Sequence, residues 1–139
     1  MLWQLPPSVA AFQALFERLV PDIDAHLRDD VELRPPTYGK AWTGKELVRR
    51  LLGYAAQEFG GLVYTDAWCN GDRFALRFEG EIEGKRFSGV DIVCLDGDGQ
   101  IALVEIFARP PTAMLALRGR MGVHVRNDPL AARLMGLAA

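Results

Sequence analysis

The feature that most constrains the fold is a change in hydrophobic period near Leu62. Before Leu62, apolar residues recur at helical spacing, whereas after it they alternate with polar residues, which is typical of half-buried strands. Three short turn signals, at residues 70–72, 83–85 and 96–99, separate the strands. Because such short connections cannot cross over to parallel partners, the sequence predicts an antiparallel meander.

Helices are predicted on both sides of this meander. Ser8 is the predicted N-cap of the first helix, which ends at Pro21, and Thr43 with Glu46 has the spacing of a capping box for the second. After the meander, Thr112 follows two prolines at the start of a third helix, which Gly122 closes, and a last short helix follows residues 127–129.

Between the first two helices, apolar and polar residues alternate over residues 21–27. This alternation predicts a half-buried strand, followed by a loop with a short strand at 31–33. The order of elements predicts an α+β fold in one domain over residues 1–139. In this fold a curved antiparallel sheet wraps around the helices to form a cone.

Composition limits the partners and the compartment. A chain of 139 residues has room for one domain, and 16 basic against 18 acidic residues give a net charge of −2, which argues against nucleic acid. No charge-free stretch reaches 18 residues, and the first residues have no positive charge ahead of the apolar part, so we expect no secretory signal and no membrane partner. Cys69 and Cys94 are predicted to be buried thiols in a reducing cytoplasm, and we expect no metal and no cofactor.

The last two strands of the meander are apolar on both faces. Val90 and Ile92 lie on one face of the third strand, and Val93 and Leu95 lie on the other. An antiparallel sheet with water on one side alternates cleanly, so this pattern indicates that both faces are covered. We expect helices on the concave face and a second subunit on the convex face, which predicts a homodimer.

Three motifs carry a family resemblance. Pro21-Asp22 opens the predicted first strand, Trp42-Thr43-Gly44 precedes the second helix, and an Asp-x-Asp-Gly-x-Ile sequence at 96–101 joins the last two strands. With the order of elements, they resemble the nuclear transport factor 2-like superfamily, with its cystatin-like fold, and especially its bacterial SnoaL-like members. The resemblance covers roughly residues 12–121. It implies a cone that encloses a mostly apolar pocket open at one end.

The resemblance does not by itself determine the function. The superfamily includes ketosteroid isomerase, polyketide cyclases, limonene epoxide hydrolase, dehydratases and members without catalytic activity. Two functions therefore stay open. The first is a pocket protein that binds a small, apolar, oxygen-containing molecule and, if it is an enzyme, acts as an isomerase, cyclase or hydrolase. The second is a non-catalytic ligand-binding or dimerisation module.

Asp91 is the principal candidate for a catalytic residue. It lies within an otherwise apolar strand, and its distance from Gly99 matches the ketosteroid isomerase aspartic acid that donates a hydrogen bond to the substrate oxyanion. An apolar pocket disfavours a carboxylate, so it raises the pKa and retains a proton for donation. The alternative is that Asp91 is ionised and paired with an arginine or a backbone amide, or faces the dimer side.

Other positions depart from the ketosteroid isomerase pattern. The isomerase base on the first strand corresponds here to a position near His26 and Leu27, and the first helix has no tyrosine. His26 is the alternative catalytic base, because the reference pKa of histidine, about 6.5, suits proton transfer at neutral pH. Alternation nevertheless groups His26 with Asp24 and Arg28 on a solvated face.

A set of aromatic and aliphatic residues is predicted to line the pocket. Tyr38 and Tyr54 are in addition candidate hydrogen-bond donors to a ligand oxygen. Glu105 is predicted to face outward and to pair with Arg77. The predicted lining residues are Tyr38, Trp42, Tyr54, Phe74, Phe78, Val104, Ile106 and Ala108.

Overall fold

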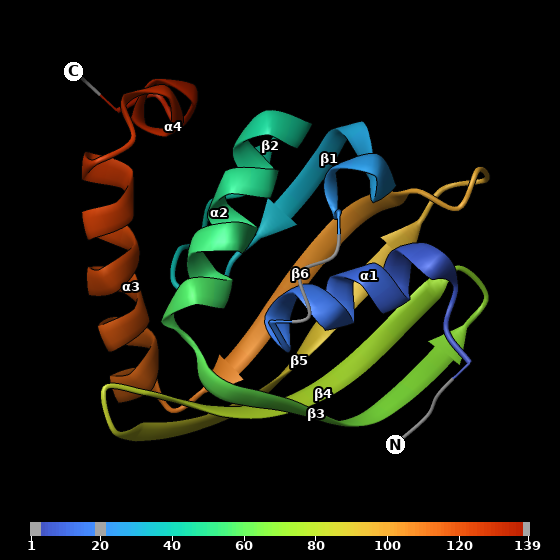
Figure 1. The fold of residues 1–139 in the computed structure, drawn as a ribbon, viewed down its shortest axis with the longest axis horizontal. Helices are drawn as coiled ribbons and strands as arrows, with labels where there is room; N and C mark the ends of the chain where they lie inside the picture. Colours follow the sequence, from blue (N-terminus) through green and yellow to red (C-terminus); the bar gives the residue numbers. More distant parts are fainter. Residues whose placement is uncertain (1–3, 19–21, 138–139) are drawn as a thin grey trace.

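The structure, a computed structural model, describes residues 4–18 and 22–137, and it has the predicted α+β architecture (Figure 1). The predicted helix end at Pro21 lies outside the described residues. In chain order the elements are α1 (Pro7–Phe16), the 3-10 helix η1 (Asp24–His26), β1 (Leu27–Arg34), β2 (Trp42–Thr43), α2 (Lys45–Glu58), β3 (Gly60–Asn70), β4 (Arg73–Ile82), β5 (Lys85–Leu95), β6 (Ile101–Arg109), α3 (Pro111–Arg126) and α4 (Pro129–Leu134).

The strands form one curved sheet in the order β2-β1-β6-β5-β4-β3. Strands β3 to β6 form the predicted antiparallel meander. The predicted α+β fold with a curved sheet is confirmed, but the sheet is mixed and not purely antiparallel, because β1 pairs with β6 in parallel. Short turns restrict the direction only of the strands that they join, and no short turn joins β1 to β6.

The strand predicted over residues 21–27 is also wrong. Residues Asp24–His26 form η1, and the strand begins at Leu27 and continues to Arg34 through residues predicted to be mostly loop. Its buried side chains are Leu27, Val31 and Leu33, and the pairing register shifts between Leu27 and Glu32. Alternation of apolar and polar residues over so few positions does not distinguish a strand from a helical turn that buries one of its sides.

Two predicted helix caps are absent. The helix α1 begins at Pro7, one residue before Ser8, whose buried hydroxyl has no hydrogen-bond partner. The N-cap of α2 is Gly44, at a φ of 110°, because Thr43 belongs to the short strand β2 and pairs with Glu32 of β1. The end of α3 was also predicted too early, since the helix continues beyond Gly122 to Arg126.

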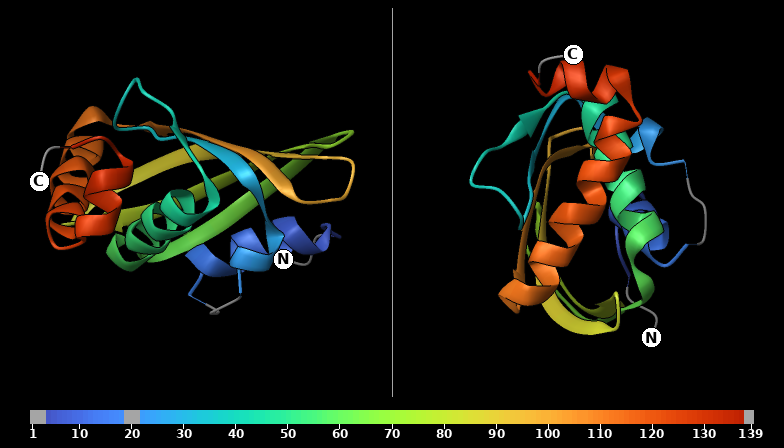
Figure 2. Two further views of the ribbon diagram at one scale, coloured as in Figure 1. Left: turned by 90° about the horizontal axis from the view of Figure 1, so that it is seen from above. Right: turned by 90° about the vertical axis from the view of Figure 1, so that its left-hand side faces the viewer.

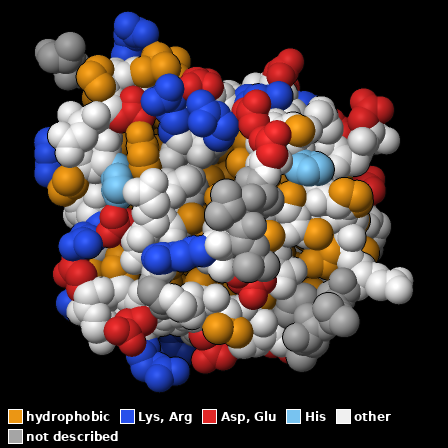
Figure 3. Space-filling model, viewed as in Figure 1, with side chains coloured by type: hydrophobic (Ala, Val, Ile, Leu, Met, Phe, Trp, Pro, Cys, Tyr) orange, Lys and Arg blue, Asp and Glu red, His pale blue; other side chains and the backbone are white. Residues whose placement is uncertain are grey.

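The helices cover the concave face of the sheet, which curves around them (Figure 2). Val48 and Leu52 of α2 are fully buried, as are Leu76 of β4, Val93 of β5 and Val104 of β6. Acidic and basic side chains are interspersed over the helical side of the molecule (Figure 3). Within the described residues, no helix is long and apolar enough to cross a membrane.

The cysteines differ from their prediction. Both are free thiols, but Cys69 is exposed and Cys94 is half-buried. Cys69 lies next to the Asn70 end of β3, at the β3–β4 hairpin, where few side chains cover it. The prediction that both thiols are buried is therefore wrong.

At Gly89 of β5, the neighbouring strands β4 and β6 leave no room for a side chain. A Cβ atom there would lie 2.2 Å from the carbonyl oxygen of Phe107 and 2.7 Å from the ring of Phe78. We expect Gly89→Ala to lower the free energy of unfolding by about 2–3 kcal/mol, since strand backbone cannot yield as a flexible side chain does. Urea unfolding measures this change.

Gly97→Ala is the matched control, because a Cβ at Gly97 meets no atom within 4 Å and its φ is not positive. We expect its free energy of unfolding to stay within about 0.5 kcal/mol of the wild type. Equal stabilities of the two variants would show that the sheet does not approach closely at Gly89.

Candidate functional site

A cavity of about 220 Å³ lies between α2, α3 and the inner face of the sheet. Phe16, Phe59 and Phe78 line it, and Tyr38 and Leu137, which are both exposed, mark its opening. Binding sites for small molecules are mostly apolar hollows of this kind with a few polar groups. The cavity is larger than the roughly 150 Å³ hollow that holds a benzene molecule.

Asp91 is the one acidic residue among the described residues that line this cavity. Strand pairing sets Asp91 between Leu76 of β4 and Ile106 of β6, so its side chain faces inward. It is only 4% exposed. The acid therefore lies at the wall of a mostly apolar hollow, whose lining also includes Arg126 and Thr37.

Tyr64 of β3 is the hydrogen-bond partner of Asp91. The buried tyrosine hydroxyl donates to Asp91 Oδ2 at 2.8 Å, which leaves Oδ1 for a ligand. Burial raises the pKa of Asp91 to about 7, although the hydrogen bond from Tyr64 opposes this shift. Burial and the nearby carboxyl also raise the pKa of Tyr64 well above its usual value. Near neutral pH, Asp91 can therefore either hold a proton for donation or accept one.

Tyr64 is not among the site residues predicted from the sequence. The available signal was the alternation along β3, where Leu62 and Tyr64 are both buried and Val63 is exposed. Tyr64 also pairs directly with Phe78, a predicted lining residue on the neighbouring strand. Its contact with Asp91 depends on two strands that are not adjacent in the sheet, and alternation does not reveal it.

The structure brings some of the predicted site residues together and leaves others apart. Those that line the cavity are Tyr38, Trp42, Phe78, Asp91 and Ile106. Those outside its lining are His26, Tyr54, Phe74, Val104 and Ala108.

Tyr54 faces Asp128 instead of the cavity. Its hydroxyl donates to Asp128 Oδ2, and Arg50 forms an ion pair with the same oxygen at 2.8 Å. Asp128 also caps α4, because its other oxygen accepts from the backbone N–H of Ala131. The hydrogen bonds from Tyr54 and Ala131, followed by Arg50, lower the pKa of Asp128 to about 2. Tyr54 thus joins α2 to the C-terminal helices, and its ring stacks on His124.

His26 does not meet Asp91 in the cavity. It lies half-buried in η1. Because η1 replaces the predicted strand, strand alternation does not give the direction of the His26 side chain. Phe74 and Val104 are inward-facing, as expected, but they belong to the close-packed core. Ala108 lines a different hollow, on the other side of the loop at residues 35–41.

The predicted ion pair of Glu105 with Arg77 is replaced by two others. Glu105 is 3.4 Å from Arg34, because the parallel pairing of β1 with β6 brings these two residues side by side. Arg77 pairs with Glu79 of its own strand at 3.0 Å. Within residues 4–18 and 22–137, no three histidine, cysteine or acidic side chains gather in a way that suits a metal ion.

The comparisons with known proteins identify the family. Residues 9–104 match the SnoaL-like domain. The chain belongs to the SnoaL-like family. A search of curated proteins found no match for this SnoaL-like protein.

Solved structures share its fold. An uncharacterised protein with a cystatin-like fold from Silicibacter pomeroyi is 31% identical, with a TM-score of 0.87 over 95% of this chain and 94% of that one. A steroid delta-isomerase from Pseudomonas aeruginosa is 24% identical, with a TM-score of 0.81 over 86% and 90% of the two chains. A hypothetical protein from Catenulispora acidiphila in complex with trimethylamine is 16% identical, with a TM-score of 0.62 over 84% and 95%.

The raised pKa of Asp91 makes stability depend on pH. The folded protein binds this proton more tightly than the unfolded chain, so the free energy of unfolding falls as the pH rises from about 4 to about 7. The full shift corresponds to at most about 4 kcal/mol. We expect Asp91→Asn to lack this contribution. The free energy of unfolding of the variant, minus that of the wild type, should therefore be higher at pH 8 than at pH 4.5, as measured by urea unfolding.

Asp29→Asn is the matched control for this prediction, because the side chain of Asp29 is 99% exposed. Its stability relative to the wild type should not change between the two pH values. A constant difference between Asp91→Asn and the wild type would contradict a raised pKa at Asp91.

Proposed function

We propose that this SnoaL-like protein binds a small apolar molecule that carries an oxygen acceptor, and that Asp91 donates a hydrogen bond to that oxygen. The observation that supports the proposal is that Asp91 lies at the wall of a mostly apolar cavity and accepts a hydrogen bond from Tyr64, which lies outside the cavity lining. Tyr64 occupies Oδ2, so the proton of the neutral acid is available on Oδ1. A neutral carboxyl in an apolar site is an effective donor to an oxygen that gains negative charge.

The size of the cavity limits the ligand. Its volume of about 220 Å³ is about one and a half times that of a hollow that binds benzene. The ligand that fits has roughly ten non-hydrogen atoms, the size of a monocyclic terpenoid or a substituted aromatic ketone. A steroid is larger than this hollow. The steroid delta-isomerase neighbour therefore supports the fold and not the substrate.

The reaction that we propose is an isomerisation, cyclisation or hydrolysis with Asp91 as acid, base or hydrogen-bond donor. Each of these reactions places negative charge on a substrate oxygen that Asp91 can stabilise. A non-catalytic binding module is the second candidate. It is favoured by one observation: among the described lining residues, neither a histidine nor a second carboxylate accompanies Asp91.

The free thiols of Cys69 and Cys94 support a reducing compartment, and we propose the cytoplasm.

The pH dependence of binding tests the role of Asp91. A panel of small cyclic ketones, terpenoid epoxides, phenols and tertiary amines is titrated calorimetrically at pH 6 and pH 8. Because the pKa of Asp91 is raised to about 7, an oxygen ligand should bind about tenfold more tightly at pH 6, where the acid is protonated. Asp91→Asn should remove this pH dependence, and Asp29→Asn should retain it.

The other outcomes separate the alternatives. Binding only of amines, and more tightly at pH 8, would replace the oxygen acceptor by a cation that pairs with ionised Asp91. Binding of no compound to the wild type would contradict the binding proposal. Chemical conversion of a bound compound by the wild type, detected by mass spectrometry and absent in Asp91→Asn, would establish catalysis. Binding without conversion of any compound would establish the non-catalytic module.

A further inference from the structure

Arg126 is the one basic residue among the described residues that line the cavity of about 220 Å³. It is the last residue of α3 and is exposed, whereas Asp91 on β5 is buried. Tyr38 and Leu137, which mark the opening of the cavity, are exposed as well. Arg126 therefore lies at the opening of the cavity, and Asp91 lies at its inner wall.

The other arginines of α2 and α3 have partners within the protein, but none of the described acidic residues forms an ion pair with Arg126. The pairs are Arg49 with Glu46, Arg50 with Glu46 and Asp128, Arg120 with Glu58, and Arg118 over the ring of Tyr38. Charge on these two helices is thus compensated inside the protein at every arginine except the one that lines the cavity.

The acidic residue nearest to Arg126 in the chain is Asp128, and its oxygens are already used. Tyr54 and Arg50 both donate to Oδ2, and the backbone N–H of Ala131 donates to Oδ1. Asp128 therefore does not neutralise Arg126. The guanidinium of Arg126 is available to an anion from outside the protein.

Gly122, one turn before Arg126, gives the guanidinium its place beside the cavity. Gly122 also lines the cavity, and a Cβ atom there would lie 3.4 Å from Arg126 Nη1. Side chains of a helix lean toward its N-terminus, so the Arg126 side chain lies back along α3 over Gly122. The charged group is thus beside the cavity lining and does not extend from the end of the helix.

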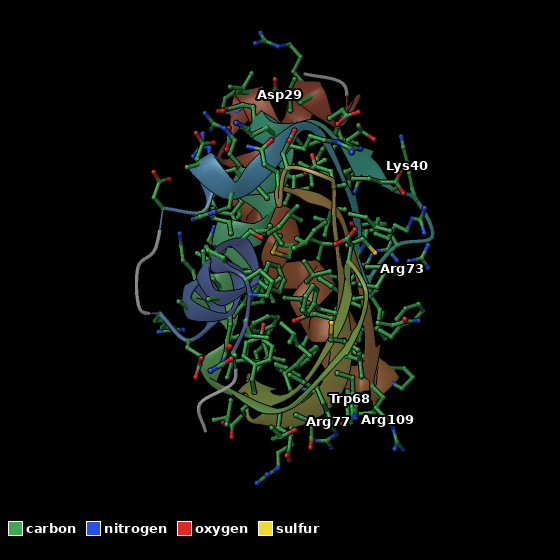
Figure 4. The ribbon with its side chains drawn as sticks, turned by 90° about the vertical axis from the view of Figure 1, so that its right-hand side faces the viewer. Asp29, Lys40, Trp68, Arg73, Arg77 and Arg109 are labelled. Atoms are coloured by element: carbon green, nitrogen blue, oxygen red, sulfur yellow. The ribbon has the colours of Figure 1, made fainter. Side chains whose placement is uncertain are left out.

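The basic residues of the meander do not supply charge to the cavity. Arg73, Arg77 and Arg109 point from the outer side of the sheet, away from the helices (Figure 4). Strand pairing agrees, because Arg77 pairs with Val90, and neighbouring residues of a strand such as Val90 and Asp91 point to opposite faces. An anion bound in the cavity would therefore meet Arg126 and none of these three arginines.

We propose that the ligand carries a carboxylate at the end away from its oxygen acceptor, and that Arg126 binds this carboxylate at the opening of the cavity. The inference rests on the proposed function, which assigns the apolar body and the oxygen acceptor of the ligand. A guanidinium presents parallel N–H groups that match the two oxygens of a carboxylate. The substrate class is thus a small cyclic keto or hydroxy acid, with its ring inside the cavity and its charge at the opening.

Pairs of an acid and its amide test this assignment. Para-acetylbenzoate and para-acetylbenzamide share one shape and one ketone and differ in charge, and oxocyclohexanecarboxylate with its amide forms a second pair. They are titrated calorimetrically at pH 6, where Asp91, with its pKa of about 7, is mostly protonated. The wild type should bind each acid about fivefold more tightly than its amide, which is the upper range for an ion pair open to water.

Arg126→Gln should bind each acid no more tightly than its amide, and its affinity for the amides should equal that of the wild type. Arg133→Gln is the matched control, because Arg133 is exposed and lies on α4 outside the cavity lining. It loses the same charge and should keep the fivefold preference. A cation in the last turn of a helix also stabilises the helix, but a change in stability does not alter the ratio of two affinities measured on one variant.

The outcomes distinguish failure of this inference from failure of the proposed function. Amides that bind to the wild type as tightly as the acids would retain the oxygen-acceptor site and overturn the carboxylate. A preference for the acids that Arg126→Gln retains would also overturn it, since another group would then hold the anion. Acid binding that depends on Arg126 but is equally tight at pH 6 and pH 8 would support the carboxylate and contradict the role of Asp91. Binding of neither acids nor amides would contradict both.

Discussion

The packing of α2 against the concave face of the curved sheet is the constraint from which the cavity follows. Val48 and Leu52 are fully buried on this side of the helix, and α2 contacts β1 as well as the other three α-helices. Leu52 and Ala55 of the same helix also form part of the cavity wall. Because α2 fills one part of the concave face and α3 closes another, a hollow remains between them and the strands. Burial of the amphipathic face of one helix thus positions the sheet, the cavity and the C-terminal helices together.

Burial of an ionised Asp91 would destabilise the folded protein, but a buried acid of this kind is suited to proton transfer and hydrogen-bond donation. An acid in an apolar environment must either lose its charge or be stabilised by hydrogen bonds, and Tyr64 supplies one such bond. The raised pKa is the physical consequence, and it means that the folded state is stabilised by protonation. Buried acids with raised pKa values are characteristic of sites that bind or transform ligands. The contrast with Asp128 is direct, since hydrogen bonds and Arg50 lower the pKa of that acid, and it acts as a structural link.

The side chains on the two faces of β5 have different surroundings. Asp91 and Val93 point inward to the cavity and the core, whereas Val90 and Ile92 point to the convex face and are half-buried. Apolar residues on both faces of a strand are typical of a sheet that is covered on both faces, and this pattern is the basis of the predicted homodimer. Pro35, Pro36 and Tyr38 line both the 220 Å³ cavity and the second hollow beside β6, so the loop at residues 35–41 separates the two hollows.

Local patterns in the sequence determined the meander and the helix α2, and they placed Asp91 on the opposite face of its strand from Val90 and Ile92. Turn residues and the alternation around Val90 and Ile92 act over a few residues, and no distant contact is needed to interpret them. The tertiary structure decided the parallel pairing of β1 with β6, and with it the contact of Glu105 with Arg34. It also decided that Tyr64 reaches Asp91, that Tyr54 turns to Asp128, and that His26 stays out of the cavity. These contacts join residues far apart in the chain, and side-chain periodicity gives only the face on which a residue lies, not the partner it meets there.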